Sequence, residues 1–124
     1  MDPIFLTLEE VLGLHEDRIR QYGGSFGIRD VGLLQSAIGT VEATFEGAYL
    51  HSTMFEMVAA YLFHISRNHP FVDGNKRTAL ACALAFLTLN DITLDVRPND
   101  LYDLAIGVAD GSRTKADAAV FFQV

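Results

Sequence analysis

The side chains best suited to chemistry gather in one ten-residue stretch, HPFVDGNKRT, at positions 69–78. The stretch combines one imidazole, one carboxylate, one glycine, one carboxamide and two adjacent cations, which are His69, Asp73, Gly74, Asn75, Lys76 and Arg77. The segments on either side of it are mostly apolar. A polar cluster between two apolar segments is typical of a functional loop that buried elements hold in place.

The second half of this stretch is expected to form the first turn of a helix, because residues 79–89 are rich in alanine and leucine. A helix N-terminus presents unpaired backbone N–H groups and a partial positive charge, so it favours phosphate groups. Glycine leaves those N–H groups open to a ligand, and the following side chains add a donor and two positive charges. The phosphate-binding residues expected here are Gly74, Asn75, Lys76 and Arg77.

The two residues before that turn supply the remaining ingredients of group transfer. Asp73 can hold Mg²⁺ together with phosphate oxygens, and the imidazole of His69 can take a proton from a hydroxyl near neutral pH. Taken singly, these residues have plainer interpretations as a surface histidine, a helix cap and a solvated helix face. Their coincidence at one helix N-terminus favours transfer from a nucleotide to a hydroxyl.

Composition sets the broad class of the protein. The 124 residues are half hydrophobic and carry a formal net charge of -7, which predicts a single globular domain over residues 1–124 and argues against nucleic acid as a partner. The start, MDPIFLTLEE, has no secretory pattern, and no apolar run is long enough to span a membrane. One cysteine, Cys82, allows no internal disulfide. We therefore expect a cytoplasmic protein.

Helix signals recur along the chain. Capping patterns, apolar periodicity and glycine stops predict about six helices, which lie at 7–23, 30–47, 53–68, 74–89, 98–108 and 114–124. The third and fourth are apolar nearly all round and are expected to be central. Residues 42–51 look like an irregular connection, and residues 92–96 alternate like a β-strand whose only visible partner is 4–6. The fold class expected is all-α.

The polar stretch also resembles a known signature. HPFVDGNKR is similar to the motif of the Fic/Doc family, HPFxDGNGRxxR, and the segments RQYGG at 20–24 and GIRDVGLLQSAI at 27–38 resemble its death-on-curing branch, the Doc-like toxins of type II toxin-antitoxin systems. The resemblance covers nearly the whole chain. It implies a compact bundle of about six helices with two central apolar ones.

The resemblance also implies roles for individual residues. His69 would be the base and Asp73 the Mg²⁺ ligand, whereas Gly74, Asn75 and Arg77 would bind the phosphates of ATP. Two positions depart from the full signature, because Lys76 replaces its second glycine and Leu80 its final arginine. The side chain of Lys76 fills part of the anion site, and Leu80 cannot bind the polyphosphate as an arginine would.

Doc-like toxins carry the same lysine, and the activity implied is transfer of the γ-phosphoryl group of ATP to a protein hydroxyl. In that reaction Lys76 and Arg77 would neutralise charge on the transferred group, which adds them to His69 as catalytic residues. The target implied is the translation elongation factor EF-Tu. Two alternatives stay open: transfer of AMP to a protein hydroxyl, and a helical binding module that has kept the loop without catalysis.

Control of the activity is expected to come from a second chain. Self-restrained Fic proteins carry a serine or threonine four residues before a glutamate–glycine or glutamate–asparagine pair, whereas here Glu42 precedes Glu46–Gly47. The resemblance therefore implies an antitoxin whose C-terminal segment covers the cleft. Residues 42–51 are a candidate flap for docking the target beside His69, with Phe45 or Tyr49 lining its path.

Overall fold

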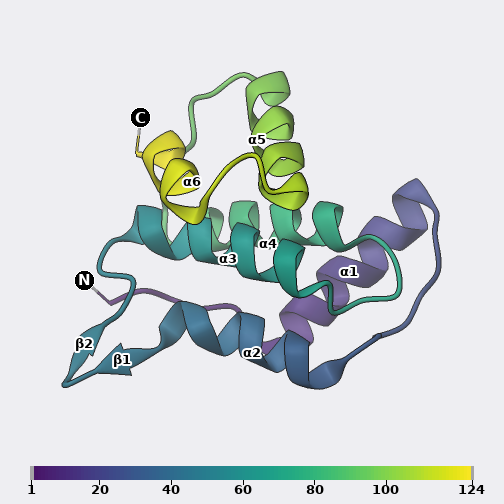
Figure 1. Cartoon of the computed structure of the whole chain (residues 1–124), viewed down its shortest axis with the longest axis horizontal. Helices are drawn as coiled ribbons and strands as arrows, with labels where there is room; N and C mark the ends of the chain where they lie inside the picture. Colours follow the sequence, from purple (N-terminus) through teal and green to yellow (C-terminus); the bar gives the residue numbers. More distant parts are fainter. Residues whose placement is uncertain (1, 124) are drawn as a thin grey trace.

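The structure, a computed structural model, describes residues 2–123. Within that range the chain forms six helices and one short antiparallel hairpin (Figure 1). The elements are α1 (Leu8–Tyr22), α2 (Val31–Glu42), β1 (Thr44–Phe45), β2 (Ala48–Tyr49), α3 (Met54–Asn68), α4 (Asn75–Leu89), α5 (Pro98–Asp110) and α6 (Lys115–Phe122). The expected all-α fold is confirmed.

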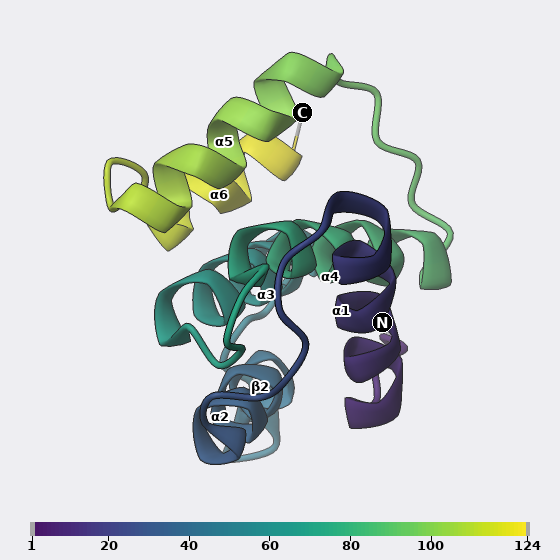
Figure 2. The same cartoon turned by 90° about the vertical axis from the view of Figure 1, so that its right-hand side faces the viewer.

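The helices form layers around α3 and α4. These two helices pack side by side in the middle, α1 and α2 cover one side of them, and α5 and α6 cover the other (Figures 1 and 2). A helix covered on several sides must be apolar nearly all round, and α3 buries an almost unbroken run, Met57, Val58, Ala59, Ala60, Tyr61 and Leu62. The expectation of two central apolar helices is therefore confirmed.

Local capping explains where most helices begin. Thr7 and Thr114 form complete capping boxes with Glu10 and Asp117. At α3 the box is only half formed, because Thr53 accepts from the backbone of Glu56 while the Glu56 carboxylate accepts from the backbone N–H of Ser52 at 2.9 Å. These caps use side chains close in sequence, which is why the sequence predicts them well.

The second helix ends earlier than predicted. It stops at Glu42, and the hairpin of β1 and β2 follows. Its two turn residues, Glu46 and Gly47, have φ angles of 51° and 81°, as a two-residue turn with the twist of a hairpin requires. Gly47 thus serves the turn of a hairpin instead of ending a helix.

The predicted strand at 92–96 is wrong. Within the described residues this segment pairs with no strand and runs as an extended link between α4 and α5. The backbone of its expected partner, Ile4, is taken by the Asn90 carboxamide, which accepts from the Ile4 N–H at 2.8 Å and donates to its carbonyl at 3.0 Å. A side chain at the end of α4 therefore replaces the expected strand pairing.

Two further expectations concern the single cysteine and membrane-spanning segments. Cys82 is a free, buried thiol, and burial raises its pKa to about 12, so it is the inert core thiol expected. In the part of the chain that the structure describes, no helix has the length and apolarity that crossing a bilayer requires.

Candidate active site

The polar loop between α3 and α4 is tied to the connection between α1 and α2. The backbone N–H groups of Arg29 and Asp30 donate to the Pro70 carbonyl at 2.7 and 3.0 Å, and the Val72 N–H donates to the Gly27 carbonyl at 3.1 Å. A β-bridge also joins residues 28 and 71. This backbone pairing fixes the loop without using the side chains that could react.

His69 ends α3 in a strained conformation. It adopts the left-handed region, with φ 53° and ψ 52°, which costs a residue other than glycine about 1–2 kcal/mol. The Arg29 guanidinium holds this helix end, because its Nε donates to the His69 carbonyl at 2.7 Å and its Nη2 to the Asn68 carbonyl at 3.0 Å. The imidazole is exposed, so a large acceptor can reach it.

Asn75 braces the loop from within. Its Oδ1 accepts from the Phe71 N–H at 2.8 Å, and its Nδ2 donates to the Phe71 carbonyl at 3.0 Å and contacts His69 Nδ1 at 3.2 Å. Because a carboxamide nitrogen can only donate, Nδ1 is the acceptor and the neutral imidazole carries its proton on Nε2. The side-chain amide is thus committed to the loop, and only the backbone N–H of Asn75 is free to meet a phosphate.

Asp73 presents its carboxylate at the entrance of α4. Oδ1 accepts from the Gly74 N–H at 2.9 Å and Oδ2 from the Ser25 N–H at 3.2 Å. Gly24 is required beside it, since a Cβ there would lie 2.7 Å from Oδ2. Among the described residues no three acidic, histidine or cysteine side chains gather as a metal site. A single carboxylate fits Mg²⁺, which completes its shell with substrate oxygens and water.

The first turn of α4 leaves backbone N–H groups open at the place where the sequence predicts an anion site. Gly74 caps the helix in the left-handed region without a side-chain hydrogen bond. The first backbone N–H to bond back is that of Thr78, to the Gly74 carbonyl at 2.9 Å. Within residues 2–123 the N–H groups of residues 75–77 have no acceptor. These groups and the helix dipole favour a phosphate.

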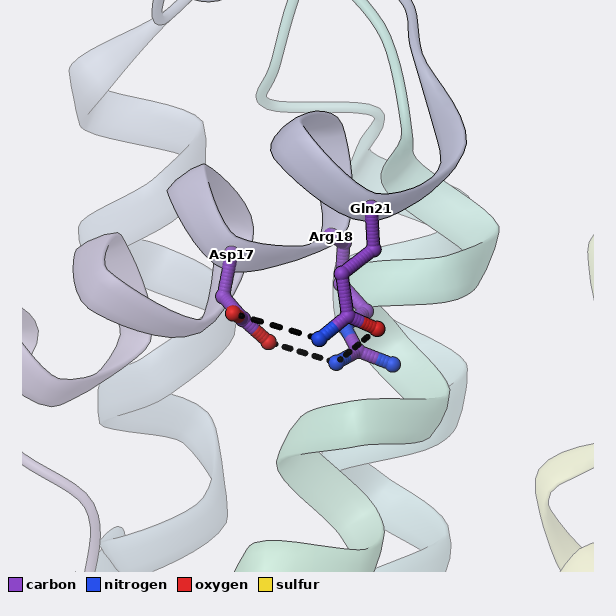
Figure 3. Close-up of polar contacts among 3 residues, drawn as sticks. All are labelled: Asp17, Arg18 and Gln21. Carbon is purple, nitrogen blue, oxygen red and sulfur yellow. Dashed lines mark hydrogen bonds and ion pairs between the residues drawn. The ribbon is translucent and has the colours of Figure 1, made fainter.

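Arg77 is held against the end of α1. Its Cζ lies 4.8 Å from the centre of the Tyr22 ring, and its Nη1 approaches the Tyr22 carbonyl at 3.4 Å. The same ring lies 5.4 Å from the guanidinium carbon of Arg18, which is itself held by Asp17 and Gln21 (Figure 3). A chain of contacts on α1 thus orients one cation of the site.

The predicted residues meet at one cavity of about 380 Å³. Its walls include all six residues singled out by the sequence, namely His69, Asp73, Gly74, Asn75, Lys76 and Arg77. Ala109, near the end of α5, closes one side. The adjacent Asp110 has its pKa lowered first by hydrogen bonds from Ser112 and further by the charges of Arg67 and Lys76. The positive charge of Lys76 therefore reaches Asp110, the residue after Ala109.

One expectation about a neighbouring segment changes. The hairpin lies at the N-terminal end of α3 and His69 at the C-terminal end (Figure 1), and a helix of 15 residues spans about 22 Å. Residues 42–51 are therefore not a flap beside His69, whereas residues 23–30 lie there. His64, five residues before His69, contacts Lys115 Nζ at 3.2 Å through its Nε2.

Comparison with known proteins places the chain in a family. Residues 5–87 match the Fic/DOC family. The chain is 41% identical to "Protein kinase doc" of Escherichia phage P1 over 115 residues, which is 92% of this chain and 89% of the phage protein. It is 42% identical to "Toxin Doc" of Mycolicibacterium smegmatis over 73 residues, which is 59% of this chain and 56% of that toxin. The chain therefore belongs to the Fic/DOC family.

Proposed function

We propose that this protein transfers the γ-phosphoryl group of ATP to a hydroxyl of a target protein. The observation that carries the proposal is the shared cavity, where an exposed imidazole, a carboxylate and the open first turn of α4 face one space. An electropositive helix N-terminus beside a base is the arrangement that phosphoryl transfer needs, because positioning and charge stabilisation supply most of its catalysis.

Each residue has a distinct task in the proposed reaction. The backbone N–H groups of residues 75–77 and the cation of Arg77 bind the phosphates, and Lys76 offsets charge that develops on the transferred group. Asp73 holds Mg²⁺, which would neutralise and orient the phosphate oxygens when bound. His69 takes the proton of the attacking hydroxyl at Nδ1, the nitrogen that carries the lone pair.

The proposed step balances as one displacement. The target oxygen forms a bond to the γ-phosphorus while the bond between that phosphorus and the β,γ-bridging oxygen breaks, and ADP leaves. The hydroxyl proton goes to His69 Nδ1, whose 3.2 Å contact with Asn75 Nδ2 lies at the long end of the hydrogen-bond range and is given up as the proton arrives. Asn75 keeps its bonds to Phe71, so the loop stays in place while the proton moves.

Phosphoryl transfer is favoured over AMP transfer by Lys76 and Leu80. A lysine side chain lines the cavity where the full family signature has a bare glycine, and Leu80 cannot clamp the polyphosphate as an arginine would. The nucleotide should therefore bind with its terminal phosphate, not its α-phosphate, beside His69. The phage relative bears the name of a protein kinase, which supports the same reaction.

A toxin role accounts for the apolar surface around the cavity. Val72, Phe26 and Ile28 are 53%, 56% and 41% exposed beside the loop that carries His69, which suits a site that other proteins cover. We propose EF-Tu as the acceptor, so that the protein inhibits translation, and an antitoxin segment as the cover that restrains it. The named toxin relative supports this role.

Mass spectrometry of a translation extract tests the proposed reaction. The extract is incubated with Mg²⁺, ATP and either wild-type protein or His69→Ala. The proposal predicts one acceptor, EF-Tu, whose mass rises by a phosphoryl group in the wild-type sample alone. A rise by an AMP group would establish adenylylation instead. Growth inhibition that persists with His69→Ala would favour the non-catalytic binding module.

A further inference from the structure

His15 lies directly behind the polar loop between α3 and α4. It is on α1, only 3% exposed, and its ring stacks on Phe71 with centroids 3.8 Å apart and planes 6° apart. Its Nε2 lies 2.8 Å from the carbonyl oxygen of Asp73. Because a carbonyl can only accept, Nε2 carries the proton and donates it to this oxygen. The sequence shows no sign of this contact, since 58 residues separate the two partners.

The hydrogen bond fixes the orientation of one peptide. In a trans peptide the C=O and the N–H point in opposite directions, and the described chain has no cis peptide. With the Asp73 carbonyl directed at His15, the Gly74 N–H points to the other side, where it donates to Asp73 Oδ1 at 2.9 Å. That side carries the carboxylate and the open end of α4.

Gly74 itself cannot secure this orientation. Its φ is 75°, a region where glycine is comfortable, but glycine also accepts the flipped peptide at little cost. A flip would replace the Gly74 N–H by the Asp73 carbonyl oxygen on the ligand side, and that oxygen would repel both the Asp73 carboxylate and a phosphate. An outside donor is therefore needed to exclude the flipped form.

We infer that His15 is a positioning residue that locks the Asp73–Gly74 peptide in the orientation required for binding Mg²⁺-nucleotide. This inference rests on the proposed function for its ligand. Packing alone does not account for the residue, because a phenylalanine would supply the stack on Phe71 without a buried polar nitrogen. His15 makes no contact with the substrate in this role and acts only through the loop.

Two variants that differ by one methylene test the lock. His15→Gln places its amide nitrogen near the position of Nε2, whereas the amide of His15→Asn is too short to reach the Asp73 carbonyl. Calorimetric titration with Mg²⁺-ATP should show affinity within about threefold of wild type for the glutamine and about tenfold weaker for the asparagine, as loss of a buried hydrogen bond predicts. His15→Phe keeps only the stack on Phe71, so its affinity for Mg²⁺-ATP should match that of His15→Asn.

A control separates positioning from general destabilisation. Val11→Ala removes another fully buried side chain of α1 and should lower the urea midpoint while leaving the affinity for Mg²⁺-ATP unchanged. Equal affinities for the glutamine and asparagine variants would overturn the inference, as would an equal loss of affinity in Val11→Ala.

A second measurement needs no nucleotide. The amide resonance of Gly74 in the free protein should keep its wild-type position in His15→Gln and move in His15→Asn, and an identical position in both would refute the lock. Wild-type protein that neither binds ATP nor transfers its γ-phosphoryl group refutes the proposed function. If the wild-type protein does both, but His15→Gln and His15→Asn bind Mg²⁺-ATP with equal affinity, the inference about His15 is refuted and the proposed function stands.

Discussion

At the scale of single residues, the chemistry of this protein depends on groups that are adjacent in sequence and on supports that are not. The six candidate residues lie in one stretch of the sequence, so their types and spacing alone single them out, and the structure lines one cavity with all of them: His69, Asp73, Gly74, Asn75, Lys76 and Arg77. Arg29 and Gly24 could not, because they reach the loop across 40 residues or more. The role of Asn75 also needed the structure, which shows its carboxamide bonded within the loop.

Arg29 should be needed for a normal transfer rate. Arg29→Ala removes the two donors that hold the carbonyls of Asn68 and His69, so the strained end of α3 should relax and carry the imidazole away. We expect the transfer rate to fall at least about tenfold, with affinity for Mg²⁺-ATP nearly unchanged because the end of α4 is intact. Steady-state kinetics and calorimetry measure the two effects. A rate equal to that of wild type would contradict the role given to Arg29.

Two neighbouring glycines give a matched pair. A Cβ at Gly24 would lie 2.7 Å from Asp73 Oδ2, whereas at Gly23 nothing lies within 4 Å, and both residues have positive φ. Both alanine variants should therefore lose about 1–3 kcal/mol of stability through backbone strain. Only Gly24→Ala should also displace the carboxylate and raise the Mg²⁺ concentration needed for half-maximal transfer. The same Mg²⁺ requirement in both variants would show that Asp73 does not hold the metal.

At the scale of elements, helices with local signals were predicted and pairings between distant segments were not. Thr7, Asp30 and Thr114 cap helices through residues three positions on, so their signals are complete in the sequence. The strand expected at 92–96 depended on a distant partner, and Asn90 takes the backbone of that partner instead. The alternation of residues could not reveal this competition.

A cluster that joins three parts of the fold predicts a pH dependence. Lys115 of α6 contacts His64 of α3 and His51 before it, at 3.2 and 3.0 Å. Burial, Lys115 and His51 together lower the pKa of His64 to about 4 from 6.5, and burial followed by Lys115 lowers that of His51, although Glu56 opposes the shift. The cluster should therefore be stable only while both imidazoles are neutral.

These pKa shifts make the folded protein less stable at acidic pH. Because the unfolded chain binds the proton first, the stabilisation is complete above pH 6.5 and is lost as the pH falls toward about 4. Urea midpoints across that range should drop for the wild type and drop less for His64→Gln. Lys115→Met should also reduce the drop, since it removes one of the charges that lower both pKa values. Parallel curves for all three proteins would contradict this account.

At the scale of the whole molecule, the layers of helices gather positive charge at one cavity of an acidic protein. The formal net charge is -7, yet Lys76, Arg77 and the N-terminus of α4 converge beside one carboxylate. The end of α3, the loop after it and the first turn of α4 supply most of the lining of this cavity, and Ala109 of α5 completes it. The fold thus brings two cations and a helix N-terminus together where a polyphosphate would bind.

Position-specific labelling of ATP shows which phosphorus the protein transfers. A translation extract receives the wild-type protein or His69→Ala, together with Mg²⁺ and ATP labelled at either the α- or the γ-phosphorus. The account predicts that a protein acceptor gains label from γ-labelled ATP only, and only with the wild-type protein. Label from α-labelled ATP, or equal labelling with His69→Ala, would contradict γ-phosphoryl transfer assisted by this imidazole.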